Sequence, residues 1–129
     1  MNTLAQLAGR VTGSFLPVSR NPHLFINEIP EDLPINYNCE WVASVISSLL
    51  TSVYIHTKDN CLRLSARKYG YIIVFEVHKP GYLNVEPLKS NLAQLQTMAE
   101  KIGGCINIGN DPVNGAVISF SFPNLPIAA

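Results

Sequence analysis

The residues of this chain best suited to metal binding or nucleophilic chemistry are three cysteines and three histidines. They are Cys39, Cys61, Cys105, His23, His56 and His78. The cysteines are widely spaced and form no CxxC pair beside a histidine pair, so we expect no zinc site. A catalytic thiol or serine would need a partner base or a G-x-S-x-G turn, and the sequence shows neither. We therefore expect no catalytic residue and no metal centre.

The charge balance excludes two classes of partner. Nine Lys and Arg residues offset nine Asp and Glu residues, so the net charge is zero. Nucleic acids and anionic membranes both need a basic surface, so we expect the chain to bind neither. Only 14% of the residues are charged, which favours an exposed apolar surface that binds another protein. We expect a soluble cytoplasmic protein, because the number of cysteines is odd and the sequence shows neither a signal peptide nor an apolar run long enough to cross a membrane.

Hydrophobic periodicity predicts three helices, over residues 3–11, 39–55 and 88–102. Gly103-Gly104 directly follows the third helix, and we interpret this pair as a helix stop rather than as a phosphate-binding loop. Trp41, on the second helix, is expected to pack in the core more readily than to anchor an interface.

The short first helix carries an apolar stripe made of Leu4, Leu7 and Val11. Large apolar side chains left in water lose about 1.5–3 kcal/mol each, so something must cover this stripe. It lies either against the chain's own sheet or against another molecule. Because little chain precedes the helix, we favour an interface with a partner or a homodimer.

Alternating apolar and polar residues predict five strands, over 24–29, 61–67, 71–78, from 106 onward, and 116–122. The elements then follow the order α, β, α, β, β, α, β, β, with adjacent hairpins and few crossovers. This order predicts an α+β fold, a two-layer sandwich with helices on one face of a mixed sheet.

Two segments carry a family resemblance. KIGGCINIGNDPVNGAVISFSFP (Lys101–Pro123) and INEIPEDLPINYNCEWVASVISSLLTSVYIHT (Ile26–Thr57) resemble the ATP-binding domain of bacterial sensor histidine kinases. That ATPase family, known as GHKL or the Bergerat fold, also includes gyrase B, the heat-shock chaperone and the mismatch-repair ATPases. The resemblance covers about residues 22–123. It implies an N-terminal helix and link at 1–21, an ATPase-like domain at 22–123 and a tail at 124–129.

The family's magnesium motif is degenerate in this chain. In the family pattern N-L-L-x-N-A the second Asn holds the magnesium ion, and the residue four positions earlier is often Asn or a catalytic Glu. Here the corresponding positions are Ser52 and Ser48. A serine hydroxyl is shorter than a carboxamide and carries no charge, so Ser52 is a poor magnesium ligand and Ser48 cannot act as a general base.

The family's adenine and phosphate contacts are also missing. A D-x-G-x-G motif should follow the strand over 71–78, but the chain has Lys79-Pro80-Gly81-Tyr82-Leu83. Lysine has no acceptor atom for the adenine amino group. Only residues 82–90 separate the strand from the next helix, so the lid that would grip the phosphates is expected to be deleted.

The resemblance and its missing motifs together imply a pseudo-kinase. We expect a non-catalytic domain that binds no ATP or magnesium and acts as a protein-interaction or regulatory module in two-component signalling. Its partner would be a response regulator, a kinase or a second copy of itself. The vestigial nucleotide pocket would comprise Ser48, Ser52, His56, Lys79, Gly81 and Tyr82. The alternative is a small ATP-binding, kinase-like domain that uses atypical residues.

Overall fold

The structure, a computed structural model, describes residues 3–13, 25–36, 39–56, 61–81, 86–111 and 115–125, except for the side chains of residues 55, 56 and 111. His23 and Tyr82, and the side chain of His56, therefore lie outside the described part of the chain. The elements are α1 (Leu4–Gly13), β1 (Phe25–Asn27), α2 (Cys39–His56), β2 (Leu62–Tyr69), β3 (Ile72–Lys79), η1 (Glu86–Leu88), α3 (Lys89–Glu100), β4 (Cys105–Asp111) and β5 (Gly115–Pro123).

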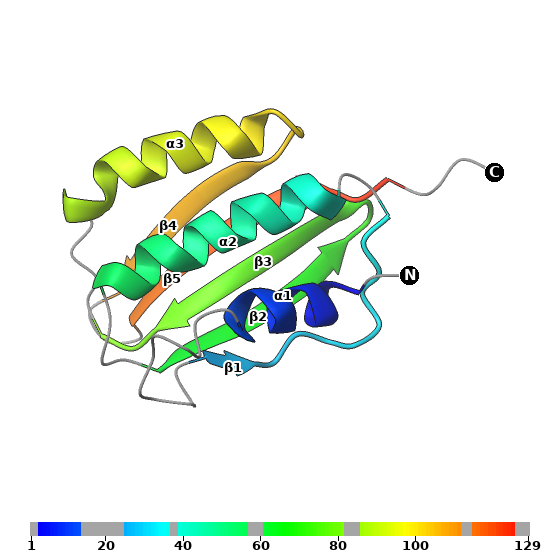
Figure 1. Cartoon of the computed structure of the whole chain (residues 1–129), viewed down its shortest axis with the longest axis horizontal. Coiled ribbons are helices and arrows are strands. Elements are labelled where there is room, and N and C mark those ends of the chain that lie inside the picture. Colours follow the sequence, from blue (N-terminus) through cyan, green and yellow to red (C-terminus); the bar gives the residue numbers. More distant parts are fainter. Residues whose placement is uncertain are drawn as a thin grey trace.

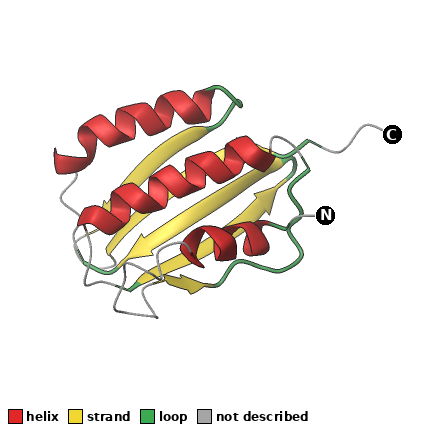
Figure 2. Ribbon diagram, in the orientation of Figure 1, coloured by secondary structure: helices red, strands yellow, loops and turns green. Residues whose placement is uncertain are grey.

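The strands form one mixed sheet in the order β1-β2-β3-β5-β4. β1 pairs in parallel with β2, and the other neighbours are antiparallel. α1, α2 and α3 all lie on one face of this sheet, and its other face carries no described helix (Figure 1). Figure 2 shows the same two layers. The predicted α+β sandwich is confirmed.

The core lies between the sheet and the helices. Strand side chains alternate, so that Phe75 on β3 and Phe120 and Phe122 on β5 point to the helix-covered face and are fully buried. The rings of Phe120 and Phe122 are tilted to each other with their centroids 4.8 Å apart. The α2 residues that meet them are aliphatic and repeat at helical spacing: Val42, Val45, Ile46, Leu49, Leu50 and Val53.

α1 belongs to this core. Leu4 and Leu7 are 0% and 1% exposed and pack with the residues of α2 and the sheet. The helix begins with reciprocal hydrogen bonds between Thr3 and Gln6, each backbone N–H donating to the other's side-chain oxygen. The interface predicted at Leu4 and Leu7 is therefore wrong, because the chain itself covers both side chains. Val11 is half-buried against the same core.

The predicted domain boundaries do not coincide with breaks in the packing. The Leu4 N–H donates to the Leu33 carbonyl at 2.8 Å, which joins α1 to the link before α2. Asn124, placed in the predicted tail, is only 7% exposed. Its Nδ2 donates to the Pro34 carbonyl and its Oδ1 accepts from the Asn36 N–H, both at 2.8 Å. The first helix and Asn124 are thus part of the same folded unit as the sheet.

The end of α3 confirms the predicted helix stop. Gly103 has φ +78°, and the Gly104 N–H donates to the Ala99 carbonyl at 2.8 Å. A Cβ on Gly104 would stand 2.4 Å from the Ser121 carbonyl oxygen. Glycine is therefore required where the chain turns from α3 into β4. None of the described helices is both long enough and apolar enough to cross a membrane.

Candidate functional site

The residues of the predicted nucleotide pocket come from elements that end at the same side of the molecule. The C-terminal half of α2, the end of β3 and the beginning of α3 all lie there (Figure 1). Lys79 ends β3 two residues after the buried Val77, so strand alternation places it on the helix-covered face. The fold thus brings the α2 serines and Lys79 to one end of the same layer.

The hydroxyl groups of α2 bond to the helix itself. Ser52 is 8% exposed, and its Oγ donates to the Ser48 carbonyl at 3.0 Å. Thr51 Oγ1 donates to the Ser47 carbonyl at 2.8 Å in the same way. This back-bonding is a usual way for a serine or threonine within a helix to satisfy its hydroxyl. It directs the proton of Ser52 to the backbone and leaves only a neutral oxygen as an acceptor.

After β3 the chain is held by backbone contacts. Lys79 Nζ donates to the Pro80 carbonyl at 2.9 Å. Gly81 has φ +76°, and a Cβ on Gly115 would lie 2.3 Å from the Lys79 carbonyl and 3.0 Å from the Gly81 nitrogen. The start of β5 therefore packs directly on the turn that follows β3, and a side chain at Gly115 would displace it.

α3 is docked on α2 at both ends of their contact. Near the start of α3, Leu88 of η1 is fully buried in the shared core. Near its end, Trp41 Nε1 donates to the Met98 carbonyl at 2.7 Å. The ammonium of Lys101 lies 5.6 Å from the centre of the Trp41 ring, a cation–π arrangement. The predicted packing role of Trp41 is confirmed, and this contact fixes the spacing of the two helices.

The donor set of the predicted pocket contains no described carboxylate. Ser48 and Ser52 supply hydroxyls, Lys79 an ammonium group and Gly81 only backbone. Within the ranges that the structure describes, no three His, Cys, Asp or Glu side chains converge in a way that could hold a metal ion. Cys39, Cys61 and Cys105 are half-buried, and none of the three forms a disulfide bond. Such a set can donate hydrogen bonds to an anion but presents no anionic oxygen to a cation.

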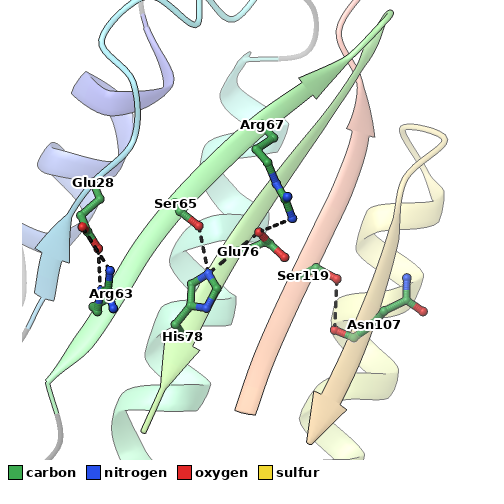
Figure 3. Close-up of polar contacts among 8 residues, drawn as sticks. All are labelled: Glu28, Arg63, Ser65, Arg67, Glu76, His78, Asn107 and Ser119. Carbon is green, nitrogen blue, oxygen red and sulfur yellow. Dashed lines mark hydrogen bonds and ion pairs between the residues drawn. The ribbon is translucent and has the colours of Figure 1, made fainter. Parts of the chain in front are cut away.

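A second polar cluster, which the sequence did not predict, lies on the opposite face of the sheet (Figure 3). Arg63 of β2 donates to Glu28 through Nε at 2.6 Å and through Nη2 at 3.3 Å. Arg67 Nη2 lies 3.2 Å from Glu76 Oε1. The hydrogen bond from Arg63 holds the pKa of the Glu28 carboxyl below its ordinary value, and the same contact raises the pKa of Arg63. The signal available in the sequence was the alternation of Arg63, Ser65 and Arg67 with core residues along one strand.

Ser65, His78 and Glu76 lie together in this cluster but do not form a hydrolase triad. Ser65 Oγ is 3.0 Å from His78 Nε2, and Glu76 Oε1 is 3.9 Å from the same nitrogen. In a Ser-His-acid triad the carboxylate bonds to the ring nitrogen that the serine does not use. The distance from Glu76 also exceeds that of a hydrogen bond. The cluster therefore lacks the proton path that would activate Ser65.

No protein-family model and no curated protein matches the sequence. Solved structures do match. The catalytic domain of histidine kinase ThkA superposes with a TM-score of 0.79 at 21% identity, covering 97% of this chain and 96% of that one. The chain has the fold of a histidine kinase catalytic domain.

Two further structures show this histidine kinase fold within longer chains. ThkA in complex with the response regulator protein TrrA matches with a TM-score of 0.76 at 20% identity, over 99% of this chain and 42% of that one. Full-length ShkA in complex with AMPPNP matches with a TM-score of 0.78 at 16% identity, over 99% of this chain and 31% of that one. In both cases this chain corresponds to less than half of the matched chain.

Proposed function

We propose that this chain is a non-catalytic histidine kinase ATPase-like domain that acts by binding another protein in two-component signalling. The observation that carries the proposal is Ser52. Its nearly buried hydroxyl is bonded to the Ser48 carbonyl at the position where the resemblance requires a magnesium-binding carboxamide. Magnesium is held by oxygen ligands that usually include one or two carboxylates, and this donor set offers none. The residues present do not fit the ion.

Lys79 supports the same conclusion for the base of the nucleotide. It occupies the region where the resemblance requires an aspartate, and its ammonium group can only donate. An adenine amino group facing it would meet a second donor and a charge that has to be desolvated. Leaving such a contact unmade costs about 1–3 kcal/mol, so a nucleotide would lose its base recognition as well as its metal.

A signalling partner is supported by the matched structures. ThkA, which shares this fold, is seen in complex with a response regulator. We infer that the partner of this chain is a response regulator, a kinase or a second copy of the chain. The proposal places the protein in the bacterial cytoplasm, where such signalling proteins act.

Isothermal titration calorimetry with ATP and ADP, each with magnesium, tests the proposal. We expect no heat of binding at millimolar nucleotide and no change in melting temperature. A nucleotide present at 100 times its dissociation constant would stabilise the fold by about 2.7 kcal/mol, which a thermal melt detects easily. Binding or ATP hydrolysis above the buffer rate would instead support the alternative of an ATP-binding domain with atypical residues. The variant Ser52→Asn is the matched comparison, because it restores the carboxamide.

A further inference from the structure

A small cavity lies where the hairpin of β2 and β3 meets the link that leads into α2. Its volume is about 90 Å³. Three segments far apart in the sequence line it: the link through Asp32 and Leu33, the hairpin through Lys68, Tyr71 and Ile73, and Asn124 after β5. The turn of this hairpin and the start of α2 lie at the same end of the molecule, whereas the predicted nucleotide pocket lies at the other end of α2 (Figure 1). The cavity is therefore separate from that pocket.

Two residues of opposite charge line this cavity, and the fold neutralises neither of them. Lys68 lies opposite Ile73 in the hairpin, so strand alternation directs its side chain to the helix-covered face, while Asp32 lines the cavity from the link. Both residues are exposed, and neither charged group forms a hydrogen bond or an ion pair with any residue that the structure describes. In particular, they do not pair with each other. An ammonium group and a carboxylate thus border one hollow, and both remain open to a ligand.

The interior of the cavity combines apolar walls with one buried amide. Leu33 and Ile73 are 8% and 1% exposed, and Asn124 is 7% exposed. The side chain of Asn124 donates one hydrogen to the Pro34 carbonyl and accepts one bond from the Asn36 N–H. A carboxamide has a second hydrogen and a second lone pair, and no described residue uses these on Asn124. A ligand in the cavity therefore meets a rigidly held amide with one donor and one acceptor to spare.

These groups together match a small zwitterion. Its carboxylate would bond to the ammonium group of Lys68 and its ammonium group to the carboxylate of Asp32, whereas an anion alone is repelled by Asp32 and a cation alone by Lys68. The ring of Tyr71, 62% exposed at the rim, offers a π face to the ammonium group of the ligand. A cavity of about 150 Å³ holds benzene, so this one, of about 90 Å³, admits a molecule no larger than a small amino acid.

We propose that this cavity binds a small free amino acid, of the size of glycine or alanine, with its carboxylate at Lys68 and its ammonium group at Asp32. The ligand would join the hairpin to the link before α2, two segments that Asn124 already connects. The inference goes beyond the proposed protein-binding role and does not depend on it.

A titration of nitrogen-15-labelled protein with glycine, followed by NMR, tests the site, and the side-chain amide signals of Asn124 report the cavity directly. Acetate and methylamine are the matched control ligands, because each carries one of the two charged groups of glycine. The titration is made at about pH 7, where both groups of glycine are charged, in a buffer with no zwitterionic component. We expect glycine to shift the Asn124 signals with a dissociation constant of about 0.1–1 mM. Acetate and methylamine should each bind at least about tenfold more weakly.

Asp32→Asn and Lys68→Gln each remove one charge from an exposed position, and thermal melts show whether each variant is folded. We expect each to weaken glycine binding at least about tenfold, because it removes one charge-assisted hydrogen bond. Glu31→Gln is the matched control variant, since this neighbouring exposed carboxylate lines a different cavity. It should change glycine binding less than about twofold.

Three results would each overturn the proposal. The first is that glycine at about 10 mM, well above the expected dissociation constant, leaves the Asn124 signals unshifted. The second is that acetate or methylamine binds as tightly as glycine, which would mean a site for a single charge. The third is that Asp32→Asn and Lys68→Gln weaken glycine binding no more than Glu31→Gln does.

Discussion

Asn124 ties three distant segments together, and its removal should destabilise the whole fold. Its side chain donates to the Pro34 carbonyl and accepts from the Asn36 N–H, both at 2.8 Å, while its own N–H donates to the Tyr71 carbonyl. Asn124→Ala keeps the backbone bond and removes the other two. Each lost bond costs about 0.5–1.5 kcal/mol, and more where the remaining group is shielded from water. We therefore expect a loss of about 2–3 kcal/mol in the free energy of unfolding.

Urea denaturation measures this loss. With a slope of about 1–3 kcal/mol per molar urea, the transition midpoint should fall by about 1 M. Asn124→Asp is the informative companion: it still accepts from the Asn36 N–H but sets a carboxylate oxygen against the Pro34 carbonyl, so it should be destabilised as well. Asn107→Ala, on an exposed strand position, is the control and should change stability by less than about 0.5 kcal/mol. A midpoint for Asn124→Ala that matches the control would show that the bonds at Asn124 contribute nothing.

Two further changes test other parts of the fold. Leu7→Ala removes a fully buried side chain from α1 and should lower the free energy of unfolding, measured by chemical denaturation, by about 2–5 kcal/mol, without changing the oligomeric state seen in sedimentation. A variant that is equally stable but associates differently would support the predicted interface at α1 instead. Gly104→Ala places a Cβ against the Ser121 carbonyl and should cost about 1–3 kcal/mol, whereas at Gly109, where a Cβ meets nothing within 4 Å, alanine should be tolerated. Equal melting temperatures for these two glycine variants would contradict the steric argument.

The fold could be predicted because its signals are local. The helix periodicity around Leu49, the glycine pair at Gly103 and the alternation of β5 each depend on residues close in sequence, and their order then allows few topologies. The fate of the α1 stripe could not be predicted in this way. Burial of Leu4 and Leu7 depends on where α2 and the link through Leu33 lie, and no periodicity within α1 reveals that.

At the candidate site, too, local features could be predicted from the sequence and features that depend on the folded structure could not. The missing aspartate and asparagines were visible as residue types, whereas the bond from Ser52 to Ser48 depends on the helix geometry and on burial. The polar cluster on the face of the sheet opposite the helices was not predicted, because recognising it requires knowledge of the strand register. Only the sheet defines that Arg63 lies opposite His78 and that Ser65 lies opposite Glu76. Contacts across neighbouring strands determine which side chains meet on a sheet surface, whereas the alternation of residues in the sequence describes one strand at a time.

The contact between Trp41 and α3 makes the chain its own spectroscopic probe. Trp41 is the sole tryptophan of the protein, and its indole N–H is bonded to Met98 while its ring lies beside Lys101. The emission of an indole depends on its exposure to water, so intrinsic fluorescence reports the docking of α3 on α2 with no background from other tryptophans. A partner that binds by separating these helices would therefore change the fluorescence emission of the unlabelled protein. A partner that binds on the face of the sheet opposite the helices would leave the emission unchanged.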